Sequence, residues 1–247
     1  MAHEPARVMP LDRTDYNRCR SYAPELLTDP DVQVVAVPPR PGEDLDPLHQ
    51  RLAGRLRPGV LLVRNIWRAG EYLEATTAYE ELSLQKFLLF AGVCQRLGAT
   101  RLEVTEIQEI AEDGRQSARA KLSLLTGKGS ASFRNETTVK VARRLKACWS
   151  WPGSRPDVDA ATALATGSGL AADDIVMGLI DQRGYDANLL TQHDLELDTS
   201  SEARREVAAA AEVQSLAKKL GPAFDADLTV LRSQTSSIRL SLTMTFA

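Results

Sequence analysis

The clearest pattern in the chain is a strict alternation of apolar and polar residues near its carboxyl-terminal end. Every second position is apolar, at Ile238, Leu240, Leu242, Met244 and Phe246. The positions between them hold Arg239, Ser241, Thr243 and Thr245. Because successive side chains of a strand point to opposite faces of a sheet, this spacing predicts a strand with one buried face.

Two earlier stretches alternate in the same way. The first places on one side Ala118, Ala120, Leu122 and Leu124. The second places on one side Val139, Val141, Leu145, Ala147, Trp149 and Trp151, with Arg143 as an interruption. The second stretch predicts a long, half-buried strand that is curved or bulged near Arg143. A helix over Thr138 to Cys148 is the alternative interpretation.

Two other stretches have a helical period. Residues 83–98 place apolar side chains on a broad face, and Gly98 stands where a left-handed residue ends a helix. Residues 199–221 begin with Thr-Ser-Ser, carry early glutamates and end with two lysines before Gly221. Both stretches pass through Leu-Gly into strand-like sequence, which indicates a helix-hairpin unit used twice. The alternative is two unrelated elements that share only a glycine stop and alternating strands.

The order of these patterns indicates an α+β fold. We expect a twisted, mostly antiparallel sheet of long amphipathic strands, covered on its apolar face by helices. Residues 1–30 carry little periodicity and are interpreted as an N-terminal arm, either loose or in the form of a peripheral helix. Residues 31–151 form a first α+β half, and residues 152–172, rich in Pro, Gly, Ser, Ala and Asp, form a loop or linker. Residues 173–247 form a second half that shares one sheet with the first.

Composition places the chain among ordinary globular proteins. It is 247 residues long, 43% hydrophobic and 26% charged, with a net charge of -3. This charge provides no general attraction to nucleic acid, so nucleic acid is not an expected partner. The three cysteines, Cys19, Cys94 and Cys148, do not form a disulfide framework. With neither a signal peptide nor a membrane-spanning run in the sequence, we expect a cytoplasmic location.

No motif in the chain carries a recognisable chemistry. The stretch "LTGKGSASF", 125–133, lacks the spacing and the following helix of a phosphate-binding loop, so we interpret it as a hairpin turn with Lys128 in solvent. His193 and Asp194 are neighbours in a strand-like segment and should point to opposite faces, which excludes a dyad between them. The cysteines and histidines have no metal-site spacing. We therefore assign no catalytic, cofactor or metal residues, expect no cofactor, and identify no small-molecule ligand.

A candidate interaction surface surrounds the two tryptophans before Pro152. It comprises Trp149, Trp151, Arg143, Arg144 and Lys146. Tryptophan suits boundaries between apolar and wet surroundings, and the basic residues add a positive patch. The alternative is that the two indoles pack against the core at the end of a strand.

Three functional hypotheses remain from the sequence. The leading one is a non-enzymatic protein that binds a protein partner or assembles with itself. The second is a soluble protein that inserts β-hairpins into membranes, because helices beside long amphipathic hairpins resemble, in pattern only, gasdermin-like and perforin-like pore formers. The third is an enzyme whose site is assembled from residues scattered along the chain.

Overall fold

The computed structural model of the chain describes residues 4–39, 47–111, 116–121, 136–145, 148–185, 190–221, 224–234 and 236–247. The chain divides into two compact units. Unit 1 consists of Met1–Asn65, Ala69–Ala78 and Arg205–Gln234, and unit 2 consists of Ile66–Arg68, Tyr79–Arg204 and Thr235–Ala247. Helices α4 (Ala75–Arg96) and α9 (Ser201–Ala217) each contribute residues to both units.

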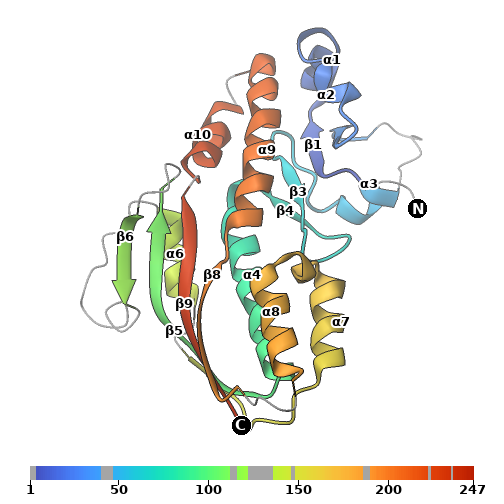
Figure 1. Cartoon of the computed structure of the whole chain (residues 1–247). Helices are drawn as coiled ribbons and strands as arrows, with labels where there is room; N and C mark the ends of the chain where they lie inside the picture. The colour runs from blue at the N-terminus through green and yellow to red at the C-terminus, as the bar shows by residue number, and fades with distance from the viewer. Residues whose placement is uncertain are drawn as a thin grey trace. The chain divides into compact units, whose positions relative to one another are not determined.

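Unit 1 is built on a sheet with the strand order β2-β1-β3-β4 (Figure 1). Its strands are β1 (Arg7–Leu11), β2 (Val32–Ala36), β3 (Leu62–Arg64) and β4 (Tyr72–Glu74). β1 and β2 are parallel, and the other neighbouring pairs are antiparallel. The core cluster of this unit consists of Val8, Val35, Leu52, Leu62 and Tyr72.

The described helices of unit 1, besides its parts of α4 and α9, are α1 (Arg13–Tyr22), α2 (Glu25–Thr28), α3 (Pro47–Leu52) and α10 (Asp225–Ser233). Residues 1–30, which we predicted to be an arm, thus include a strand and two helices. The strand forms because four of its five residues, Val8 to Leu11, are buried. The first helix begins at Asp12, whose carboxylate accepts a hydrogen bond from the Asp15 backbone N–H at 2.8 Å.

Unit 2 contains the sheet that the alternating patterns predicted. Its strands are β5 (Ala99–Ile110), β6 (Gln116–Lys121), β7 (Cys148–Ser150), β8 (Gln192–Asp198) and β9 (Ser237–Phe246). The order is β6-β5-β9-β8, with β7 also paired to β5, and every described pairing is antiparallel. The α+β prediction with an antiparallel sheet is therefore confirmed.

The two faces of this sheet divide by polarity. On β9 the five alternating apolar residues are all buried, from 0% exposed at Ile238 to 5% at Phe246, and the polar residues between them are half-buried. β5 places Leu102, Val104 and Ile107 opposite Met244, Leu242 and Leu240. The buried face of β9 is thus the one that the sequence predicted.

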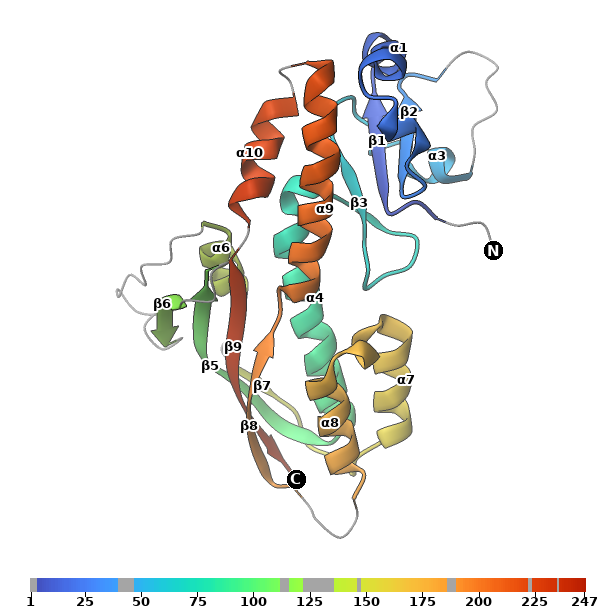
Figure 2. The same ribbon diagram turned by 45° about the horizontal axis from the view of Figure 1, so that its top comes forward.

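Helix α4 covers the apolar face of the sheet (Figures 1 and 2). Cys94 Sγ lies 3.3 Å from Met244 Sδ, and the Tyr79 hydroxyl donates a hydrogen bond to the Ser236 carbonyl. Burial raises the pKa of both the Tyr79 hydroxyl and the Cys94 thiol. Both groups are consequently neutral members of the core.

Two further helices of unit 2, α7 (Val158–Ser168) and α8 (Asp174–Arg183), lie side by side near α4 (Figures 1 and 2). α7 occupies much of the stretch 152–172 that we predicted to be a loop. Asp157 starts it by accepting a hydrogen bond from the Ala160 N–H at 2.9 Å, and Gly169, at φ 82°, ends it. An alanine- and glycine-rich helix can approach its neighbour closely. A Cβ at Gly92 of α4 would lie only 3.2 Å from Leu164 Cδ2.

A buried ion cluster joins α4 to the starts of α8 and α9. The Lys86 ammonium lies 2.8 Å from Asp173 Oδ2 and 3.0 Å from Glu202 Oε2, and its side chain is 2% exposed. Asp173 caps α8, and Glu202 lies in the first turn of α9, where helix dipoles favour negative charge. The charge of Lys86 is therefore neutralised inside the unit.

The segment around Val139 differs from our principal prediction. Residues Glu136–Arg144 form helix α6, so the strand prediction was wrong and the alternative helix is present. Its buried residues, Thr138, Val141, Ala142 and the following Leu145, recur at the spacing of one helical face. Glu136 in the first turn and two arginines in the last turn also suit the helix dipole.

The second Leu-Gly stop also leads to a different element than predicted. Residues 225–233 form helix α10 instead of a strand, so the proposed helix-hairpin unit does not recur there. Phe224, Leu228 and Leu231 are buried at helical spacing, whereas Val230 is 41% exposed. The predicted turn at 125–133, with Lys128, lies outside the described residues, as do parts of the alternating stretch after Lys121. Within the described chain, no helix is both long enough and apolar enough to cross a bilayer.

Replacing Leu242 with alanine should lower the free energy of unfolding by about 2–4 kcal/mol, because a leucine that is 1% exposed leaves a cavity in the sheet-helix core. Ser241→Ala, one position away on the polar face, should change it by less than about 0.5 kcal/mol. Urea denaturation of both variants measures the difference. Equal midpoints would contradict the assignment of the buried face.

Candidate functional site

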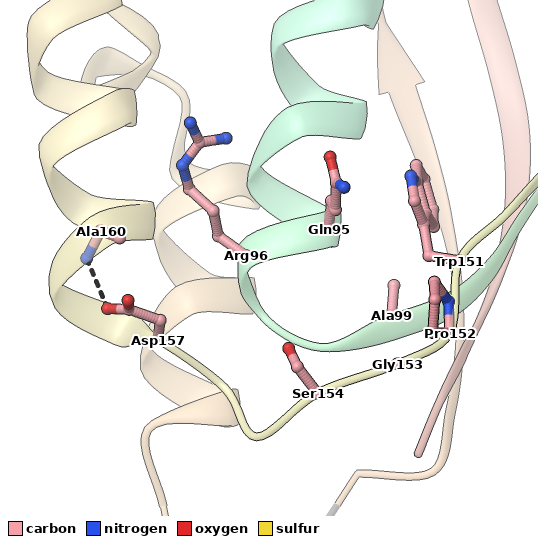
Figure 3. A pocket seen from close by; sticks show the side chains of 9 residues that line it. All are labelled: Gln95, Arg96, Ala99, Trp151, Pro152, Gly153, Ser154, Asp157 and Ala160. Carbon is pink, nitrogen blue, oxygen red and sulfur yellow. Dashed lines mark hydrogen bonds between the residues drawn. The ribbon is translucent and has the colours of Figure 1, made fainter.

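An open pocket of about 470 Å³ lies in unit 2 where α4 ends, β5 begins and the chain passes from β7 to α7 (Figure 3). We call it the Trp151 pocket. Its lining comprises Gln95, Arg96, Ala99, Trp151, Pro152, Gly153, Ser154, Asp157 and Ala160. Two segments that lie far apart in the sequence, 95–99 and 151–160, therefore meet in it.

Two glycines allow these segments to approach. Gly98, at φ 83°, ends α4, and a Cβ there would lie 2.2 Å from the Ser154 carbonyl oxygen. Gly153, at φ 80°, would place a Cβ 2.7 Å from Thr100 Cγ2. A larger residue at Gly98 would collide with backbone and one at Gly153 with the Thr100 side chain, and the positive φ at both positions also favours glycine. The role of Gly98 as the left-handed stop was correctly predicted.

Main-chain hydrogen bonds fix the pocket wall between these glycines. The Trp151 N–H donates to the Thr100 carbonyl at 2.9 Å, and the Asp157 N–H donates to the Arg96 carbonyl at 2.8 Å. The second bond also satisfies a carbonyl in the last turn of α4. The connection from β7 to α7 is consequently held at both of its ends.

Arg183 of α8 supports the same region from the protein interior. Its Nε and Nη2 donate to the Leu97 carbonyl at 3.2 and 3.1 Å, and its Nη1 donates to the Leu190 carbonyl at 2.9 Å. The guanidinium carbon lies 4.3 Å from the centre of the Phe246 ring. Burial lowers the pKa of this arginine. The end of α4 and the end of β9 are thereby joined.

The side chains that face the pocket have both apolar and polar character. The Trp151 ring is half-buried, and Gln95 and Arg96 are exposed. Figure 3 shows Gln95 between Trp151 on one side and Arg96 on the other. The Arg96 Nη1 donates to the Gly92 carbonyl at 2.9 Å, and Asp157 uses one oxygen to cap α7. The pocket therefore offers an aromatic surface beside a guanidinium and a carboxylate.

The residues of the candidate interaction surface are distributed over different surroundings. Trp149 packs against Phe87 of α4, with ring centroids 4.9 Å apart, whereas Trp151 lines the pocket. Arg144 donates to Glu80 and Glu81 at 2.8 Å each, which raises its pKa. Arg143 is exposed, and Lys146 lies outside the described residues. Arg144 is thus engaged with α4, and of these residues only Trp151 lines the pocket.

Arg96 is the pocket residue that the sequence did not reveal. It is 55 positions before Trp151, and only the folded end of α4 brings the two into one lining. Its place in the last turn of a predicted helix suited a dipole role and gave no other signal. The residue pattern and motif spacing of a sequence do not reveal which distant segments come together in the fold.

The titratable residues considered from the sequence lie elsewhere. His193 pairs with Met244 and Asp194 with Thr243, so they occupy opposite faces of β8, as predicted. Asp194 accepts a hydrogen bond from the Thr243 hydroxyl at 2.6 Å. Among the described residues, no group of three His, Cys, Asp or Glu side chains is arranged to hold a metal ion.

No protein-family model matches the chain, and neither the curated proteins nor the solved structures contain a significant match to it.

The two tryptophans should respond differently to truncation. Trp149→Ala should destabilise the protein by about 3 kcal/mol, because it removes a ring packed on Phe87. Trp151→Ala should lower the free energy of unfolding by less than half as much, because its ring lies at an open pocket. Thermal unfolding followed by circular dichroism compares the two. A larger loss for Trp151 would show that its ring supports the core.

Proposed function

We propose that this chain is a membrane-inserting protein that assembles with copies of itself, and that it inserts by converting the segment around α6 into β-hairpin. The observation that supports the proposal is the placement of β6 and β7. Both pair antiparallel with the same edge of β5, β6 against Glu106 to Ile110 and β7 against Arg101 to Glu103. They continue one another along that edge, and residues 122–147 are inserted between them.

The inserted segment is long enough for a membrane hairpin. Residues 122–147 number 26 (147 − 122 + 1), and a strand that spans a bilayer needs about 9–11 residues. Two such strands and a short turn fit within this length. The sequence predicts a turn in the same segment, at Gly127 and Gly129, with alternating residues before it.

The α6 sequence carries two periodicities at once. Its helical face buries Thr138, Val141 and Ala142. The same sequence read in steps of two places Val139, Val141 and Leu145 on one side, with Arg143 as an interruption. A segment with both patterns keeps most of an apolar face when it changes from helix to strand.

The helical state of α6 has identifiable weaknesses. The Thr138 hydroxyl is buried without a hydrogen-bond partner in the described chain, which typically costs about 1–3 kcal/mol. The ion pairs of Arg144 with Glu80 and Glu81 join the last turn of α6 to α4, and the arginine side chain is 50% exposed. Pairs this exposed contribute little in water, so they can act as a releasable latch.

The rest of the sheet supports the same proposal. β5 has 12 residues and β9 has 10, so each reaches the length of a spanning strand. The polar face of the sheet carries paired charges, such as Arg239 of β9 with Glu196 of β8 at 3.2 Å, and the other face of β5 and β9 is apolar. Alternation of this kind suits a strand with lipid on one side and water on the other. Binding of a separate protein partner, the other part of our leading sequence hypothesis, remains the alternative outcome.

A liposome-leakage assay tests the proposal, with dye-loaded phosphatidylcholine vesicles containing phosphatidylglycerol. The wild-type protein should release the dye, and Arg144→Gln should release it several-fold faster, because α6 loses its bonds to Glu80 and Glu81. Arg155→Gln is the matched control. It removes the same charge outside residues 122–147, at an exposed side chain for which no ion pair is found among the described residues. It should leak at the wild-type rate.

Absence of leakage from all three proteins would contradict membrane insertion. In that case, a defined complex in size-exclusion chromatography with light scattering would favour partner binding or soluble self-assembly. Equal acceleration by both substitutions would show that net charge, instead of the α6 latch, controls insertion.

A further inference from the structure

The Trp151 pocket carries several hydrogen-bond donors for which the described residues provide few partners. Within the described chain, no hydrogen bond is made by the Trp151 indole N–H or by the Gln95 side-chain amide. Arg96 donates only to the Gly92 carbonyl, and no carboxylate of the described residues pairs with it. Donors of this kind are available to a ligand that supplies acceptor oxygens.

We propose that the Trp151 pocket binds an acidic peptide segment of a partner protein, with a carboxylate against Arg96 and an adjacent apolar side chain against Trp151. Arginine binds carboxylates through paired N–H groups. Trp151 and Arg96 belong to the residue types that dominate protein-binding hot spots. Gln95, which lies between them in Figure 3, can pair with a peptide group through both its donor and its acceptor. This site stands independently of the membrane proposal.

Asp157 decides between a peptide carboxylate and a phosphate. Its carboxylate lies on the pocket wall and uses one oxygen to cap α7. A second negative charge there opposes a doubly charged phosphate more than a singly charged carboxylate. The other Asp157 oxygen, for which no partner is found among the described residues, can instead accept a peptide N–H. A pocket that offers one cation, one anion and one amide is therefore complementary to a peptide with a single acidic side chain.

The size of the pocket agrees with this ligand. A volume of about 470 Å³ lies within the usual range of ligand pockets, roughly 300–1,000 Å³, and accommodates one or two amino-acid side chains. The wall is held by the Trp151 and Asp157 main-chain bonds, so little ordering is needed when a ligand binds.

Indole NMR of the whole protein, ¹⁵N-labelled at tryptophan, tests the site. The chain has three tryptophans, and Trp151→Phe assigns the signal of Trp151. Titration with Ac-Glu-Phe-NH₂ should shift the Trp151 indole signal in a saturable way, with a Kd on the order of 1 mM, as befits a small probe. The neutral Ac-Gln-Phe-NH₂ should bind at least about tenfold more weakly, because the charge-assisted bonds to Arg96 are lost.

Arg96→Gln should weaken binding of the acidic probe, Ac-Glu-Phe-NH₂, by a similar factor. Arg155→Gln is the matched control, since Arg155 is exposed, close in sequence and outside the lining. It should leave the Kd within about twofold. A folded spectrum, with the Trp67 and Trp149 signals unmoved, shows that each variant retains its structure. Equal binding of the two probes, or no saturable shift below about 10 mM, would overturn the site. Tighter, Arg96-dependent binding of glycerol phosphate would overturn the peptide assignment.

Discussion

The packing of β9 against α4 is the contact on which unit 2 depends. Its five alternating apolar side chains must leave water together, and this requirement fixes which face of β9 meets the helix. β5 and β8 both pair with β9, so their side chains also divide between the apolar face and the polar face of the sheet. α4 in turn ends at Gly98 beside β5, which brings Arg96 into the Trp151 pocket. The pocket is thus a consequence of the core.

Lys86 and Arg183, two cationic side chains inside this core, each have defined partners. Lys86 meets two carboxylates that also stabilise the starts of α8 and α9, and removal of its charge would remove an ion pair from each of them. Arg183 satisfies two backbone carbonyls and covers the Phe246 ring. These groups join helices to the sheet end, whereas Arg144 binds α6 to α4 at the surface. The buried contacts and the half-exposed one therefore lie in different places.

The local sequence pattern was sufficient to predict those elements whose apolar residues follow only one period, either that of a helix or that of a strand. The alternation of Ile238 to Phe246 predicted β9, and the stop at Gly98 predicted the end of α4. It was insufficient for α6 and α10, because their apolar residues satisfy a strand pattern and a helical one, and tertiary burial decides between them. The α+β class was predictable from the sum of the patterns. The presence of Arg96 and Trp151 in one pocket was not predictable, because the fold brings together two segments that are far apart in the sequence.

We propose that the α6 segment changes from helix to strand in a membrane. Single cysteines placed at positions 137–143 of a cysteine-free variant, labelled with an environment-sensitive fluorophore, measure this directly. In solution the emission should follow the helical face that buries Thr138, Val141 and Ala142. On phosphatidylglycerol-containing liposomes it should alternate at every second position. Retention of the helical period on liposomes that are leaking would contradict the account.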